Sequence, residues 1–180
     1  MQFKIIAARD LNEQARQQIA ELCFTAFDED PWSQYAFMQT AVHLVAILDD
    51  KIVSHALWTD RIFIIHGSVK VRTAYVEYVT TDAMMRGKGL ASQLLRYLIE
   101  ALTHMGYELT ALQPEDVTFY KKLGWTPWLG DLYIQQDRST YLTDENEIML
   151  YPLSIRLKAL LSHCTVDDTI CTEWREGELW

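Results

Sequence analysis

The chain has 180 residues, so we expect one domain over residues 1–180, long enough to bury a hydrophobic core of its own. Hydrophobic residues make up 49% and charged residues 23%, and no apolar run is long enough to span a bilayer, so no membrane partner is expected. The net charge of −9 argues against nucleic acid as a partner, because phosphate binding depends on lysine and arginine.

The N-terminal residues and the cysteines indicate the compartment. MQFKIIAARDLNEQ lacks a basic region followed by an apolar core, so we expect no secretory signal and a cytoplasmic location. Cys23, Cys164 and Cys171 are scattered and odd in number, without CxxC spacing. This pattern argues against a disulfide framework and against a metal site. Packing is the favoured role of these cysteines, with a catalytic cysteine left open.

The first half of the chain predicts a helix and a meander of antiparallel strands. Apolar residues recur at helical spacing over residues 10–27, and Asp10 or Asn12 would cap this helix. The expected strands are rich in β-branched and aromatic residues and lie between turn residues: 3–7, 43–48, 52–58, 61–66 and 69–81.

The second half predicts strands that alternate with helices. A long amphipathic helix begins at Leu90 and ends at Gly106, and a short helix covers 115–123. The expected strands follow one another at 107–112, 125–128, 132–136 and 147–153. From Ser154 we expect irregular structure with at most a helical turn or two. This order predicts an α+β fold, in which a mixed, mostly antiparallel sheet with flanking helices contains one parallel crossover.

The turn Arg86-Gly87-Lys88-Gly89 joins the last strand of the meander to the long helix. Glycine allows backbone N–H groups to turn toward a ligand, and a helix N-terminus attracts anions. The turn is therefore a candidate phosphate cradle, with an ordinary strand-to-helix turn as the alternative. The dinucleotide fingerprint GxGxxG is absent, because Ser92 stands where its third glycine belongs, and the Walker motif is absent too.

Two signatures resemble a known family. Arg86-Gly87-Lys88-Gly89-Leu90-Ala91 fits the [RQ]xxGx[GA] signature of the GNAT N-acetyltransferases, at the strand-to-helix position that this family uses. The family's second signature, FYxxxGW, matches residues 119–125. The resemblance covers roughly the central half of the chain. It implies a GNAT fold with a central strand, pyrophosphate loop and helix, and acetyl-CoA (coenzyme A) as cofactor.

A narrower resemblance extends to the last residue. Tyr75-Val76-Glu77, the GWxPWxG element at 124–130 and the closing WREGELW at 174–180 are similar to the aminoglycoside 2′-N-acetyltransferases. This subfamily implies transfer of acetyl to the 2′-amino group of an aminoglycoside, a small cationic amino sugar. It also implies a homodimer and a role in antibiotic resistance, although no stretch of the sequence demonstrates either.

The resemblance assigns Glu77 as general base, acting through a water molecule, and Tyr120 as general acid toward the departing thiolate. Strand alternation places Tyr75, Glu77 and Val79 on one face, where a lone carboxylate is costly to bury unless it is paired. An exposed face or an internal ion pair is the alternative for Glu77, and a half-buried core tyrosine is the alternative for Tyr120.

The resemblance also implies the cofactor-binding residues. The backbone of the strand residues Tyr78, Val79, Thr80 and Thr81 would pair with pantetheine, with the amide of Val79 polarising the thioester carbonyl. The pyrophosphate would be held by the backbone amides of Arg86, Gly87, Lys88, Gly89, Leu90, Ala91 and Ser92.

The substrate-binding residues follow from the narrower resemblance and from acidic clusters near 28–30, 144–147 and 173–178. Carboxylates would hold the ammonium groups of an aminoglycoside. The implied residues are Asp30, Trp32, Glu77, Asp144, Glu145, Glu178 and Trp180. The loop after Asp30 lacks the second aspartate of the subfamily, and glutamate replaces aspartate at 145 and 178. These departures leave open an atypical aminoglycoside such as kasugamycin beside the gentamicin and tobramycin type.

Two alternatives stay open from the sequence. One is a GNAT enzyme that acetylates another small amine, such as a polyamine or a peptide N-terminus. The other is a non-catalytic GNAT-like domain that binds coenzyme A, which the presence of both Glu77 and Tyr120 disfavours.

Overall fold

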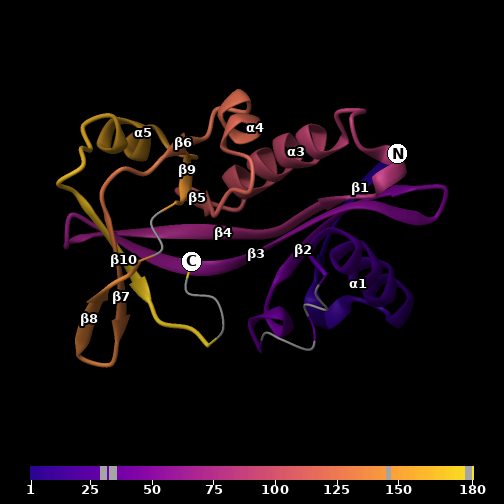
Figure 1. The fold of residues 1–180 in the computed structure, drawn as a ribbon, viewed down its shortest axis with the longest axis horizontal. Coiled ribbons are helices and arrows are strands. Elements are labelled where there is room, and N and C mark those ends of the chain that lie inside the picture. Colours follow the sequence, from indigo (N-terminus) through magenta and orange to yellow (C-terminus); the bar gives the residue numbers. More distant parts are fainter. Residues whose placement is uncertain (29–31, 33–35, 145–146, 177–179) are drawn as a thin grey trace. The chain divides into compact units, whose positions relative to one another are not determined.

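A computed structural model describes residues 1–28, 32, 36–144, 147–176 and 180 (Figure 1). The chain forms two compact units. The first unit contains Met1–Thr59 and Val76–Glu100, and the second contains Asp60–Tyr75 and Ala101–Trp180. Two long strands, β3 (Lys51–Ile65) and β4 (Val69–Thr81), contribute residues to both units.

The first unit has the strand order β1-β2-β3-β4. Its elements, beside the parts of β3 and β4 that it contains, are β1 (Gln2–Ala7), η1 (Ala8–Asp10), α1 (Glu13–Phe27), η2 (Ala36–Gln39), β2 (Val42–Leu48), η3 (Ala83–Met85) and most of α3 (Leu90–His104). Figure 1 shows α1 and α3 on opposite sides of these strands. The two helices therefore cover the two faces of this part of the sheet.

Local sequence signals account for most of the first unit. Asn12 caps α1, because its side chain accepts a hydrogen bond from the amide of Ala15 at 2.8 Å. The helix buries Ile19, Leu22 and Cys23, so packing is confirmed as the setting of Cys23. Asp49 and Asp50 both have positive φ, which closes the predicted hairpin of β2 and β3.

The second unit has the strand order β6-β9-β5-β4-β3-β10-β7-β8. Its elements, beside its parts of β3, β4 and α3, are β5 (Leu109–Leu112), α4 (Val117–Lys122), β6 (Thr126–Pro127), β7 (Asp131–Gln136), β8 (Ser139–Leu142), β9 (Met149–Pro152), α5 (Ile155–Leu161) and β10 (Thr169–Glu173). The pairs β4–β5 and β7–β10 are parallel, and the pairs β3–β10, β5–β9, β6–β9 and β7–β8 are antiparallel. The predicted α+β class with a mixed, mostly antiparallel sheet is confirmed.

The structure corrects four details of the predicted order. The expected strands 52–58 and 61–66 are one continuous strand, β3, because Thr59 and Asp60 continue the ladder. The segment after Ser154 is regular rather than irregular, with α5 followed by β10. The strand β8 was not expected, and β7–β10 is a second parallel pair. None of the helices in the described residues is long and apolar enough to cross a membrane.

The core of the second unit gathers apolar side chains from most of its strands and from α5. Its buried members are Phe63, Ile65, Val71, Tyr75, Leu109, Ala111, Trp128, Leu132, Ile134, Ile148, Leu150, Leu157, Ile170 and Trp180. Trp180 is 1% exposed and meets Phe63 edge to face, with the ring centroids 5.6 Å apart. The last residue of the chain is therefore part of this core.

Candidate functional site

Glu77 lies on β4 directly before a residue with an unusual backbone conformation. Its side chain is only 9% exposed. The next residue, Tyr78, has a φ of 51°, which is a left-handed conformation that tyrosine rarely adopts. The alternation predicted for residues 75–80 is therefore interrupted at Tyr78. Such an irregularity within a strand re-aims side chains and backbone groups, which is a common feature beside functional sites.

One buried histidine, His55, contacts the carbonyl group of Tyr78, and a second, His43, contacts His55. His55 Nδ1 lies 3.1 Å from the Tyr78 oxygen, and His55 Nε2 lies 2.9 Å from His43 Nδ1. A carbonyl oxygen only accepts, so His55 Nδ1 carries a proton, and in the neutral pair His43 Nδ1 donates to His55 Nε2. Trp32 stacks on His43, with ring centroids 5.6 Å apart and planes 7° from parallel. This chain of donors stabilises the left-handed turn at Tyr78.

Burial lowers the pKa of both histidines, with His43 at about 4. Arg16 adds to the lowering at His43, and His43 adds to it at His55. At pH values between about 4 and the usual histidine pKa of about 6.5, the unfolded state binds more protons than the native state. The free energy of unfolding therefore falls as the pH falls through this range. We expect His43 alone to reduce the free energy of unfolding by about 3 kcal/mol between pH ~7 and pH ~4. Urea denaturation at both pH values measures this loss.

Two variants test this pH dependence: His43→Gln removes the buried histidine, and His104→Asn is the control that removes an exposed one. Glutamine is neutral at both pH values, so His43→Gln should have a shallower pH dependence of stability than the wild type. His104 is exposed at the end of α3, and its replacement should leave the pH dependence unchanged. An equal loss of stability in the wild type and in His43→Gln would contradict the assignment.

The glycine turn leads from β4 into α3 in the first unit. Gly87 and Gly89 have φ values of 74° and 76°, and a Cβ built on either would meet no atom within 4 Å. Arg86 Nε donates to the carbonyl of Thr81 at 3.1 Å, which fixes the turn to the end of the strand. The first amides of a helix have no intrahelical acceptor, and α3 begins at Leu90. Open space beside free amides fits a pyrophosphate.

Tyr120 lies in the second unit on α4, a short helix capped by Asp116, whose Oδ1 accepts from the Phe119 amide. The Tyr120 ring packs edge to face on Trp125 at 6.0 Å, and the residue is 8% exposed. Burial raises the pKa of the Tyr120 phenol above its usual range, and Glu115 and Asp116 add to this effect. The phenol is therefore protonated at neutral pH, as a proton donor must be.

Of the seven predicted substrate residues, Trp32, Glu77 and Trp180 are buried or packed against other side chains, as described above. Asp30, Glu145 and Glu178 lie outside the described residues. Asp144 is exposed in the second unit and lines a recess of about 370 Å³ with Tyr141 and Trp174, which are 55% and 44% exposed. Carboxylate and aromatic faces together suit a cationic sugar, because the rings offer flat apolar surface and attract cations.

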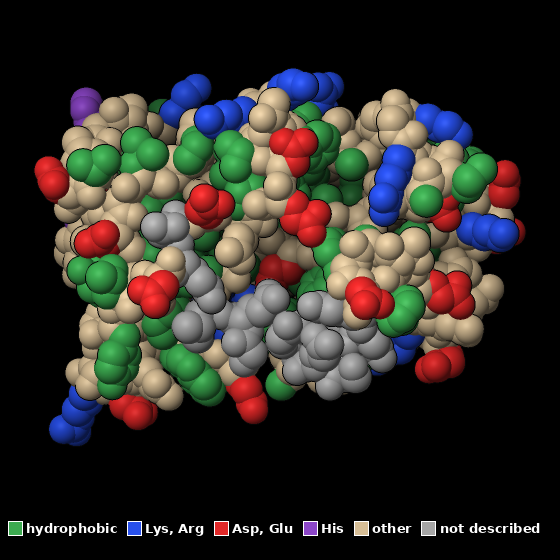
Figure 2. Space-filling model, in the orientation of Figure 1, with side chains coloured by type: hydrophobic (Ala, Val, Ile, Leu, Met, Phe, Trp, Pro, Cys, Tyr) green, Lys and Arg blue, Asp and Glu red, His purple; other side chains and the backbone are tan. Residues whose placement is uncertain are grey.

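Acidic side chains are numerous on the face of the molecule shown in Figure 2, consistent with the net charge of −9.

Each unit contains one set of the predicted site residues. The first contains Glu77, the strand residues 78–81 and the amides of 86–92, and the second contains Tyr120, Asp144 and Trp180. Sequence reasoning missed His43 and His55. Two histidines on paired strands of the predicted hairpin were the available signal.

Comparisons with known proteins agree with these features. A family model described as an acetyltransferase (GNAT) domain matches residues 7–128. An aminoglycoside 2′-N-acetyltransferase of Mycolicibacterium fortuitum is 25% identical over 180 residues, which cover 98% of this chain and 91% of that protein.

Solved structures show the same fold at low identity. The GNAT family N-acetyltransferase YhbS of Escherichia coli, in complex with CoA, has a TM-score of 0.65 and 17% identity, covering 97% of this chain and 89% of that one. A probable N-acyltransferase of Enterococcus faecalis V583 has a TM-score of 0.56 and 19% identity over 72% of this chain. The present chain spans only 33% of that protein's length.

Proposed function

Because the chain belongs to the GNAT acetyltransferases, we propose that it transfers the acetyl group of acetyl-CoA to the 2′-amino group of an aminoglycoside. The observation that carries the choice of acceptor is the 25% identity to an aminoglycoside 2′-N-acetyltransferase over 98% of the chain. The net charge of −9 and the recess of Asp144, Tyr141 and Trp174 support a cationic sugar.

The first unit would hold the cofactor and prepare the nucleophile. The amides of residues 86–92 would bind the pyrophosphate, and the backbone of 78–81 would bind the pantetheine arm. The Val79 amide would polarise the thioester carbonyl. Glu77 would accept a proton from the substrate ammonium through a water molecule, because only a neutral amine can attack. Bound acetyl-CoA supplies the activated acetyl group.

The second unit would supply the acid and part of the sugar site. Tyr120 would donate its proton to the departing thiolate. Asp144 would accept from an ammonium group of the sugar. Asp30, Trp32, Glu145, Glu178 and Trp180 are the other substrate residues that the resemblance implies.

The experiment that tests the function follows thiol release from acetyl-CoA with a panel of amines. We expect release with aminoglycosides that carry a 2′-amino group and none with their 2′-hydroxyl counterparts. Kasugamycin, gentamicin and tobramycin belong in the panel, with spermidine and a short peptide as competing acceptors. Release with spermidine or the peptide alone would overturn the proposed acceptor, and no release with any amine would favour a binding domain.

Tyr120→Phe is expected to lower kcat about a hundredfold while leaving thermal stability close to that of the wild type. Phenylalanine keeps the packing on Trp125 but cannot donate a proton. Steady-state kinetics and thermal denaturation measure the two effects. Tyr151→Phe is the matched control, because the Tyr151 ring also packs on Trp125, at 5.8 Å. If Tyr120→Phe turns over as fast as Tyr151→Phe, Tyr120 is not the acid.

A further inference from the structure

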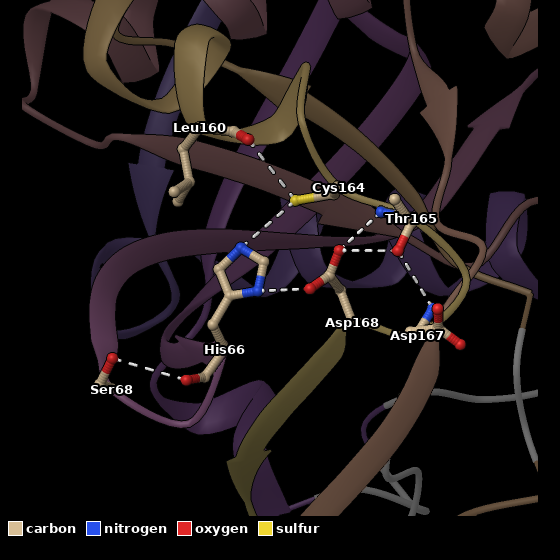
Figure 3. A network of polar contacts seen from close by, with 7 residues as sticks. All are labelled: His66, Ser68, Leu160, Cys164, Thr165, Asp167 and Asp168. Atoms are coloured by element: carbon tan, nitrogen blue, oxygen red, sulfur yellow. Dashed lines mark hydrogen bonds and ion pairs between the residues drawn. The ribbon is translucent and has the colours of Figure 1, made fainter.

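A cysteine, a histidine and an aspartate form a connected cluster in the second unit, outside every residue assigned to acetyl transfer (Figure 3). Cys164 Sγ lies 3.6 Å from His66 Nε2, and His66 Nδ1 lies 2.7 Å from Asp168 Oδ1. A nucleophile beside a base, with the base oriented by a third group, is the arrangement of covalent catalysis. The cluster joins the turn after β3 to the loop between α5 and β10.

Asp168 is held in place by its own loop. Its Oδ2 accepts from the Thr165 amide at 2.6 Å and from Thr165 Oγ1 at 3.3 Å, which leaves Oδ1 for His66 (Figure 3). The Asp168 carbonyl accepts from the Asp131 amide at 3.1 Å. A Cβ on Gly130 would come within 1.9 Å of that carbonyl oxygen, so glycine is required for this close approach. The carboxylate is therefore preorganised for the imidazole.

The protonation states suit a general-base role for His66. Hydrogen bonds from Thr165 hold the pKa of Asp168 below its usual value, so it is a carboxylate and accepts from His66 Nδ1–H. His66 Nε2 is then the ring nitrogen that faces the thiol. Burial and Asp168 raise the pKa of Cys164, so this group is a thiol at neutral pH and needs a base. Its other neighbour, the Leu160 carbonyl at 3.6 Å, accepts hydrogen bonds but does not remove protons.

The thiol is accessible and lies beside an apolar recess. Cys164 is half-buried, and His66 is exposed. A cavity of about 160 Å³ is bordered by Cys164 together with Pro127, Trp128, Leu129 and Leu161. A small apolar group bonded to the sulfur of Cys164 would find room and apolar contacts there.

We propose that Cys164 is a nucleophilic modification site that reacts with small apolar disulfides, with His66 as its base and Asp168 as a positioning residue. The thiol proton moves to His66 Nε2, and the Cys164 sulfur attacks one sulfur of the disulfide. A protein–ligand S–S bond forms as the reagent S–S bond breaks, and the departing thiolate takes the proton back from His66. The products are a mixed disulfide at Cys164 and one free thiol.

A metal site is the competing explanation of the same atoms. A tetrahedral zinc ion with one sulfur and one nitrogen ligand would space these atoms at about 3.6 Å, and Asp168 would support the histidine from behind. Zinc sites take three or four protein ligands, however. Within the described residues, only Cys164 Sγ and His66 Nε2 could bind one metal ion together. The Asp168 carboxylate pairs instead with Nδ1, on the other side of the imidazole ring. The geometry therefore favours the nucleophile.

The test is the rate at which dithiodipyridine, a neutral aromatic disulfide, labels each cysteine of the whole chain, read by peptide mass spectrometry. Cys171 is the internal reference, because it is half-buried and burial raises its pKa as it does for Cys164. We expect Cys164 to react at least about tenfold faster than Cys171. His66→Gln should remove this advantage and leave the Cys171 rate unchanged, whereas a loosened fold would accelerate both.

Several outcomes would overturn the proposal. Equal labelling of Cys164 and Cys171 in the wild-type chain would show that the thiol is not activated, whether or not any variant folds. If His66→Gln leaves the labelling rate of Cys164 unchanged, His66 does not act as its base. Stoichiometric protection of Cys164 by micromolar Zn²⁺, in protein first treated with a chelator, would assign the cluster to a metal instead. Acetyl-transfer activity does not enter this test, so its failure and failure of the proposed function are separate results.

Discussion

Replacing Glu77 by Gln is expected to lower kcat/KM for the proposed acetyl transfer by about a hundredfold to ten-thousandfold below neutral pH. The substrate ammonium must lose a proton before it can attack, and glutamine cannot accept that proton. At high pH the amine is already neutral, so the variant should approach the wild-type rate. The pH dependence of kcat/KM, followed by thiol release, therefore distinguishes a lost base from a damaged fold, which would lower the rate at every pH.

The Glu77 experiment needs two controls. Glu100→Gln makes the same chemical change on the exposed surface of α3 and should leave the pH profile unaltered. Binding of CoA by Glu77→Gln, measured by calorimetry, should stay near the wild-type value, because the proposed cofactor site uses backbone amides. An unchanged pH profile in Glu77→Gln would show that the buried carboxylate has a structural role.

Elements specified by neighbouring residues were predicted well. The helix α3 follows from its apolar spacing and ends at His104, two residues before Gly106, whose φ is 77°. The hairpin of β2 and β3 follows from two apolar runs around an aspartate turn. The parallel pair of β4 and β5 follows because a helix connects them. In each case the information lies within one element and its turn.

Elements specified by distant partners were missed. The strand β10 has the sequence TICTE, and only two of its residues are apolar. It is ordered by pairing in parallel with β7 and in antiparallel with β3, and neither partner is near it in the sequence. The left-handed Tyr78 likewise has no local signal, because the side chains of His55 and His43 that stabilise it come from other strands.

The candidate functional residues show the same difference between local and distant sequence information. Motifs of contiguous residues located the glycine turn and Tyr120, and the structure gives each a setting compatible with its expected role. The cluster of His66, Cys164 and Asp168 was not predicted, since Cys164 is far in sequence from His66. Scattered cysteines indicate packing when read alone, and only the fold reveals the imidazole beside the thiol.

Trp180→Ala is expected to lower the free energy of unfolding by about 3–5 kcal/mol, as for other buried tryptophans. The side chain is 1% exposed, contacts Phe63 edge to face, and lies below the guanidinium of Arg61 at 5.9 Å. Alanine would leave a large cavity in this core and would remove the cation–π contact. Urea denaturation of the whole chain measures the loss.

Trp174→Ala is the matched control for Trp180, because it makes the same truncation six residues earlier in the chain at a site that is 44% exposed. Its stability should change by about 1 kcal/mol or less, while its KM for the aminoglycoside should rise if Trp174 borders the sugar site. Equal stabilities of Trp180→Ala and the wild type would contradict the core role. Trp180→Phe separates the core role of this residue from its proposed substrate role, because phenylalanine keeps most of the packing on Phe63 but lacks the indole. A variant that is stable, and whose KM matches the wild type, would assign the indole to the core and not to the substrate.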